Sequence, residues 1–74
     1  MPEQAIRLIY PPNLLDVPVI NQLIRRYDLT VNILRAQVTP QEGWVDVHLT
    51  GSSAAIEDAM AWLTSQGIEA QRLA

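Results

Sequence analysis

Residues 31–50, VNILRAQVTPQEGWVDVHLT, decide the fold, because they contain two apolar stretches joined by a short polar connection. Apolar residues that alternate with polar ones are typical of half-buried strands. The connection, residues 40–43, starts with proline and ends with glycine, as a hairpin turn prefers. We therefore predict strands over residues 30–39 and 44–50 that pair in an antiparallel hairpin.

The first of these strands departs from simple alternation. Val31 and Ile33 are two residues apart, but Leu34 and the residues after it continue the alternation on the opposite parity, so one face cannot account for both sets. The turn suggests that Thr39 pairs with Trp44. In that register the helix-facing pairs are Val38 with Val45, Ala36 with Val47 and Leu34 with Leu49, while Gln37 faces Asp46 and Arg35 faces His48 on the other surface.

Two arrangements of residues 31–33 then stay open. Without a bulge, Val31 and Ile33 lie on the uncovered face of the sheet, where two exposed β-branched residues indicate an interface with a partner. With a bulge between residues 33 and 36, Asn32 points outward and its amide is free to hydrogen-bond a ligand. A local hydrogen bond to a neighbouring backbone group is the other role that fits Asn32.

Helical and extended patterns flank the hairpin on both sides. Residues 5–10 alternate and end at two prolines, which predicts a strand. Asp16 is expected to cap a helix whose apolar stripe is Ile20, Leu23, Ile24 and Tyr27. After the hairpin, Ser52 and Ser53 predict the cap of a second helix, which ends before Gly67, and residues 68–73 predict a final strand.

This order of elements, βαββαβ, defines the predicted fold class. It is an α+β, ferredoxin-like arrangement with a four-stranded antiparallel sheet and two helices on one face. The 74 residues are too few for two cores, so residues 1–74 are expected to form a single domain. Because so small a core supplies little net stability, we expect a homodimer.

Composition excludes several classes of protein. The net charge of −3 argues against nucleic acid as a partner, since such a partner requires a basic face. Apolar runs are too short to insert into a membrane, and the N-terminus lacks a signal-peptide pattern, so a cytoplasmic location is expected. With no cysteine and one histidine, no metal site and no cofactor are expected. Carboxylates are scattered and no phosphate-binding loop is present, so we predict that the chain is not an enzyme and has no catalytic residues.

The sequence resembles the NIL domain family, which is named after a strand motif that stands here as Asn32-Ile33-Leu34. The resemblance covers nearly the whole chain. It includes the first strand with its following proline, and then three segments: INQLIRRYDLTVNILRAQV, GWVDVHLTG and AIEDAMAWLTSQGIEAQRL. The family implies a ferredoxin-like fold similar to that of the amino-acid-sensing ACT domains.

Members of this family occur at the C-terminus of the ATPase subunit of bacterial methionine importers. There the domains are dimeric, bind methionine beside their interface and inhibit transport. The resemblance implies that Asn32 contacts the ligand and that Ile33 and Leu34 shape its apolar surroundings or the interface. Arg35 is close enough in sequence to contribute to the same ligand site.

Two functions follow as expectations. The first is a non-enzymatic, regulatory domain that senses methionine or a related sulfur amino acid at a dimer interface. The second is a protein-interaction module that recruits a ferredoxin or a sulfur-metabolism enzyme through an exposed strand edge or sheet face, with Val31 and Ile33 at the contact.

Overall fold

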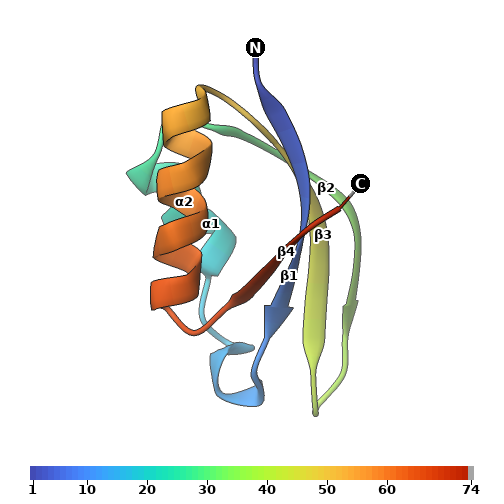
Figure 1. Ribbon diagram of the computed structural model, residues 1–74. Helices are drawn as coiled ribbons and strands as arrows, with labels where there is room; N and C mark the ends of the chain where they lie inside the picture. Colours follow the sequence, from blue (N-terminus) through green and yellow to red (C-terminus); the bar gives the residue numbers. More distant parts are fainter. Residues whose placement is uncertain (74) are drawn as a thin grey trace.

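The chain folds into one four-stranded sheet with two helices on the same side of it (Figure 1). The structure is a computed structural model that describes residues 1–73. All strand pairs are antiparallel and the strand order is β2-β3-β1-β4, so the predicted ferredoxin-like class is confirmed. The elements are β1 (Glu3–Tyr10), the 3-10 turn η1 (Pro12–Leu14), α1 (Val19–Arg26), β2 (Thr30–Val38), β3 (Gly43–Thr50), α2 (Ser53–Ser65) and β4 (Glu69–Arg72).

The core lies between the sheet and the helices. Alternation along β1 turns Ile6, Leu8 and Tyr10 toward the helices, as expected, and all three are buried. Leu23 of α1 and Leu63 of α2 are fully buried against them. Burial of these side chains is the main source of stability, because each removes apolar surface from water.

The ends of the helices show which local signals hold. Ser52 caps α2 as predicted, since its hydroxyl accepts a hydrogen bond of 3.0 Å from the amide of Ala55. Gly67, with a φ of 91°, follows that helix in the left-handed conformation that favours glycine. The cap predicted at Asp16 is wrong: Pro18 occupies the N-cap of α1, and no side chain caps it. Ile24 is also 48% exposed rather than part of the buried stripe.

Between the bulge and the turn, the predicted register of β2 against β3 is wrong by two residues. Each β3 residue there pairs with the β2 residue two positions earlier than predicted. Thr39 does not pair with Trp44, because its amide closes a tighter turn by donating to the carbonyl of Glu42 over 2.8 Å. The observed pairs are Val38 with Gly43, Gln37 with Trp44, Ala36 with Val45 and Arg35 with Asp46.

A bulge in β2 turns the residues before it to the faces opposite to those that a regular strand would give them. The register shifts between Ile33 and Arg35, so Leu34 is the extra residue. Beyond it the pairs are Ile33 with Val47, Asn32 with His48 and Val31 with Leu49. Of the two arrangements left open by the sequence, the bulged one is present, and it places Asn32 on the sheet face away from the helices.

Candidate functional site

Strand β2 forms an edge of the sheet that is rich in exposed apolar side chains. It pairs only with β3, so its outer side is unpaired within residues 1–73. Ile33 is 61% exposed, Leu34 55% and Val38 69%. An exposed apolar edge strand is a surface on which another strand can pair, and natural proteins usually protect such edges with charged residues. This edge is therefore the first candidate for an interaction surface.

The predicted site residues lie along this edge on different faces. Asn32 and Arg35 are exposed on the open face, opposite His48 and Asp46. Ile33 shares the helix-facing side with Val47, while Leu34 occupies the bulge. Val31 is half-buried and packs against the core, so it is less available than Ile33. The structure thus brings Asn32 and Arg35 to one face, but separates them from the neighbouring apolar side chains.

Arg35 has a partner that the sequence register did not predict. Its Nε donates to Oδ2 of Asp46 over 2.6 Å, and Arg7 of β1 donates to the same carboxylate through Nε (2.7 Å) and Nη2 (3.0 Å). Asp46 has no exposed surface. Hydrogen bonds from Arg7, and then from Arg35, lower the pKa of Asp46 from 3.8 to about 2, although burial alone would raise it.

This Arg7–Asp46–Arg35 cluster occupies the middle of the open face. The guanidinium carbon of Arg7 lies 4.3 Å from the centre of the Trp44 ring, a cation–π contact. His48 is 3.6 Å from a carboxylate oxygen of Glu3 farther along the same face. Because one carboxylate accepts from both arginines, the cluster joins strands β1, β3 and β2 and keeps one positive charge in excess.

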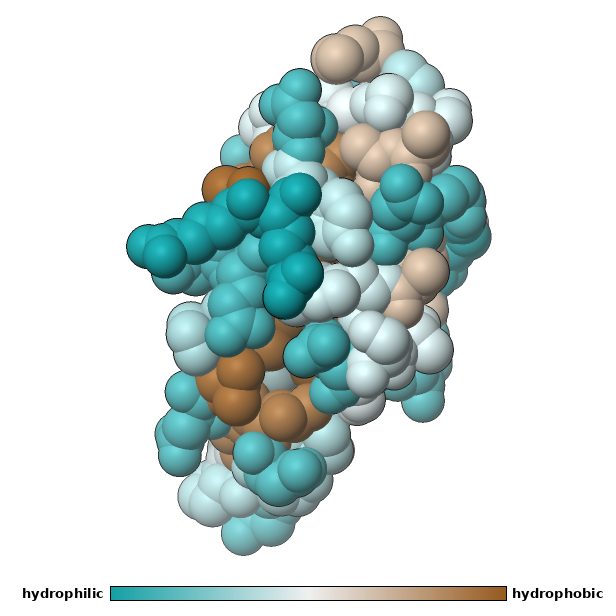
Figure 2. All heavy atoms as spheres, turned by 90° about the vertical axis from the view of Figure 1, so that its left-hand side faces the viewer, coloured by the Kyte–Doolittle hydropathy of each residue, from teal (hydrophilic) through white to brown (hydrophobic). Residues whose placement is uncertain are grey.

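An apolar pocket lies on the helix side, at the hairpin end of β2. Its volume is about 240 Å³, and its walls come from the end of β1, residues 15–18, the first turn of α1 and the ends of β2 and β3. Figure 2 shows a hollowed brown patch with teal polar side chains around it on the lower part of this face. Pockets for drug-sized ligands have roughly 300–1,000 Å³, so this one suits a smaller molecule such as an amino acid side chain.

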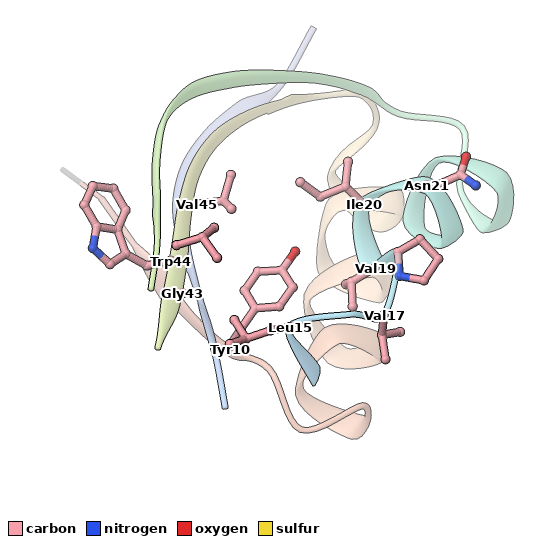
Figure 3. A pocket seen from close by; sticks show the side chains of 11 residues that line it. Tyr10, Leu15, Val17, Val19, Ile20, Asn21, Gly43, Trp44 and Val45 are labelled. Atoms are coloured by element: carbon pink, nitrogen blue, oxygen red, sulfur yellow. The ribbon is translucent and has the colours of Figure 1, made fainter. Parts of the chain in front are cut away.

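The side chains in the pocket are nearly all aliphatic (Figure 3). Leu15, Val19 and Val45 are among them, and Val38 brings the β2 edge into the wall. The hydroxyl of Tyr10 points into the space between Val45 and Ile20 (Figure 3). Burial raises the pKa of Tyr10 above its usual value of 10.0, so the hydroxyl is protonated at neutral pH. The pocket is therefore apolar with one buried hydrogen-bonding group.

The sequence reasoning missed this pocket. Its walls come from two stretches that are distant along the chain, residues 10–21 and 38–45, and each residue has the pattern of an ordinary strand, loop or helix residue. A partial signal was the run from Pro11 to Pro18, whose three prolines exclude a regular α-helix and indicate a connecting segment between the first strand and the first helix.

Residues 1–73 match neither the pattern of a metal-binding cluster nor that of a membrane-spanning helix. No group of three or more histidine or acidic side chains in this range is arranged to hold a metal ion. None of the helices in the same range has the length and apolar character needed to cross a bilayer.

The fold and its surface define a small ferredoxin-like domain with an apolar pocket beside an exposed edge strand. Comparison with known proteins makes the assignment specific: the NIL domain family model matches residues 4–72, and the chain belongs to that family. The solved C-terminal domain of an ABC transporter ATP-binding protein from Enterococcus faecalis has the same fold. Its TM-score is 0.81 at 19% identity, over 95% of this chain and 82% of that one.

Curated relatives fall into two groups. An uncharacterized protein of Synechococcus elongatus is 39% identical over 86% of this chain and 83% of its own length. Methionine import ATP-binding proteins MetN of Helicobacter pylori and Burkholderia thailandensis are 31% and 32% identical over 96% and 92% of this chain. The chain spans only 23% and 21% of those two proteins.

Proposed function

We propose that this domain is a regulatory module that binds methionine or a related sulfur amino acid at the junction of two copies of the chain. The observation that carries the proposal is the apolar pocket at the end of the exposed β2 edge. Similarity to part of the methionine import proteins supports methionine as the first ligand to test. The role is non-enzymatic, and its place is the cytoplasm, where an internal amino acid pool is sensed.

The chemistry of the pocket suits an amino acid with an unbranched apolar side chain. A thioether chain fits among aliphatic walls such as those of Leu15 and Val45, where it leaves water without losing strong hydrogen bonds. The ammonium and carboxylate groups must stay at the polar rim, because burying them unpaired is far too unfavourable. Asn21, which is exposed, is among the residues that line the pocket.

A second copy supplies the rest of the site in this proposal. If two β2 edges pair antiparallel around a two-fold axis between Leu34 and Arg35, residues equally distant from the axis face each other. Val31 of the partner subunit then lies opposite Val38, and Asn32 of the partner subunit opposite Gln37. The bulge changes parity near the axis, so apolar residues meet on the helix side and polar residues on the open face.

Such a pairing brings the motif strand of one copy beside the pocket of the other. Val38 and Trp44 line the pocket, and Gln37 lies next to Val38 in the chain and opposite Trp44. Asn32 of the partner subunit would lie opposite Gln37 on the open face, across the sheet from the pocket, so the pairing by itself does not place Asn32 at the rim. Ile33 of the partner subunit would extend the apolar wall, in line with its expected role.

A protein-interaction module is the second candidate, and the exposure of the edge favours it. Ile33, Leu34 and Val38 are each more than half exposed, so a strand of another protein could pair with β2 without any ligand. In that case a ferredoxin or an enzyme of sulfur metabolism occupies the edge, and Asn32 contributes only to that contact.

Thermal unfolding with and without ligand separates the two functions. The purified protein is heated at fixed concentration with millimolar methionine, homocysteine or cysteine. Ligand that binds only the native state adds about 2.7 kcal/mol to stability at a hundredfold excess over Kd, which shifts Tm by about 10–20 °C in a domain this small. A selective rise with methionine is expected.

The Asn32→Ala variant tests the ligand contact that the family motif implies. Loss of the shift with self-association intact, measured by sedimentation equilibrium, supports that contact, and a retained shift shows that the pocket binds the ligand without it. Asn13→Ala, the same change at an exposed asparagine of η1 outside the pocket lining, is the matched control and should keep the shift. If none of the amino acids raises Tm of the unmodified protein, amino acid sensing by this chain is rejected and the interaction module becomes the leading function.

A further inference from the structure

Tyr10 stands out in the pocket because its polar group has no role in the fold. Its side chain is 9% exposed and its ring belongs to the core, yet its hydroxyl points into the pocket (Figure 3). The hydrogen bonds within residues 1–73 do not include this hydroxyl, and it is not sealed off from the pocket space. Phenylalanine would fill the same part of the core, so the hydroxyl needs another explanation.

We infer that Tyr10 selects a sulfur-containing side chain over a hydrocarbon of the same shape by donating a hydrogen bond to it inside the pocket. The inference rests on the proposed function and adds a specificity-determining residue to it. The polar rim of the pocket would hold the amino acid end of the ligand, and Tyr10 would recognise the chemistry at the far end of its side chain.

The reason lies in what happens to the hydroxyl when a ligand enters. In the empty pocket water can pair with it, and a ligand that fills the space displaces that water. A hydrocarbon chain then leaves the buried donor unpaired, which is unfavourable, whereas a thioether sulfur is a weak acceptor and also packs well against the edge of an aromatic ring. The raised pKa of Tyr10 keeps the hydroxyl protonated and able to donate.

The other polar groups of the pocket cannot take this role. Figure 3 shows the indole of Trp44 turned away from the pocket, and it stacks with Arg7 on the open face. The amide of Asn21 is exposed and points away from Tyr10 and Val45 (Figure 3). The side chains around the hydroxyl, those of Val45 and Ile20, are aliphatic, so Tyr10 supplies the hydrogen-bonding side chain at the inner wall within residues 1–73.

Methionine and norleucine test the inference, because they differ only by a sulfur atom in place of a methylene group. Their affinities are measured by calorimetry for the unmodified protein and for Tyr10→Phe, which removes the hydroxyl and keeps the ring. We expect methionine to bind about tenfold more tightly than norleucine to the unmodified protein. In Tyr10→Phe the ratio should fall to about twofold or less, mainly through tighter binding of norleucine.

Tyr27→Phe is the matched control, since Tyr27 packs edge-on to Trp62, outside the pocket lining, and its loss of a hydroxyl should leave the ratio unchanged. Equal affinities for the two ligands in the unmodified protein, or a preference that survives in Tyr10→Phe, would overturn the role of Tyr10 and leave amino acid sensing intact. Binding of neither ligand would reject the proposed function, and the role of Tyr10 with it.

Discussion

Arg35 and Asp46 face each other directly on strands β2 and β3, with 2.6 Å between Nε and Oδ2, immediately after the bulge at Leu34. In the continuous register expected from the sequence, Arg35 would instead face His48, and Asn32 would point toward the helices. The ion pair and the bulge therefore belong to the same choice of register. Arg7 of β1 supports this register, because its two hydrogen bonds hold the carboxylate of Asp46 in place.

Replacing Arg35 should loosen that register. In Arg35→Gln, Asp46 loses its partner on β2, so pairing of Asn32 with His48 should weaken and pairing of Leu34 with Leu49 should become populated. Cross-strand nuclear Overhauser contacts report the two pairings directly. Arg7→Gln also removes a partner of Asp46, but from β1, and should keep the bulged register. Identical contacts in both variants would show that the ion pair does not select the register.

Acid should weaken the fold through Asp46. Its pKa is lowered from 3.8 to about 2 in the folded chain, so its ionised form contributes stability that is present above about pH 4 and is lost as the pH falls through about 2. Asp46→Asn should be less stable at neutral pH and should lack this part of the acid dependence. Urea unfolding from neutral pH down to about 2 measures both effects. Asp58→Asn, on the exposed surface of α2, should keep the acid dependence of the unmodified protein.

The β2 edge should carry self-association. A charge at Ile33 would be buried between two paired edges, so Ile33→Lys should produce a monomer at concentrations where the unmodified protein is a dimer. Sedimentation equilibrium measures the two states. Gln71→Lys places the same charge on the exposed β4 edge and should leave the dimer intact. A dimer that survives Ile33→Lys but dissociates in Gln71→Lys would move the interface to β4.

Gly43 should control the size of the pocket. A Cβ at this position would lie 2.6 Å from Cδ2 of Leu15, so Gly43→Ala must push that flexible side chain aside within the pocket. We expect weaker methionine binding at a stability cost of about 1 kcal/mol, as for mild overpacking. Gly51→Ala is the control, because its Cβ would meet Leu29 and the backbone oxygen of Asp28 away from the pocket. That variant should lose stability and keep its affinity for methionine.

Local patterns were enough to predict the element order and the open sheet face. Alternation identified the strands, the serine before α2 identified its cap, and the polar residues of β3 identified the uncovered surface. The register of β2 was different, because its apolar residues fit two parities equally well. The Arg35–Asp46 ion pair accompanies the observed parity, and Arg7, which holds the same carboxylate, is 39 positions from Asp46, a separation that no local window contains.

The candidate site was predictable only in part for a related reason. Asn32 and its neighbours were found through a motif, which names residues but not the surface they face. The pocket depends on how the loop after β1 crosses the end of the hairpin, and nothing in the spacing of Leu15 or Val38 indicates that crossing. The alternation of β1 placed Tyr10 in the core, and its ring does belong to the core. Its hydroxyl reaches the pocket because Tyr10 is the last residue of the strand.

The bulge at Leu34 decides which face of the sheet the start of β2 presents. In a regular strand, one added residue turns everything beyond it to the opposite face. At Leu34 the bulge absorbs the extra residue, so Asn32 keeps the face that it would have if Leu34 were absent. Deletion of Leu34 should therefore leave a regular strand with the same pairs on both sides. Insertion of one residue within a paired half of β2 should be far more disruptive, because no bulge there absorbs the change of face.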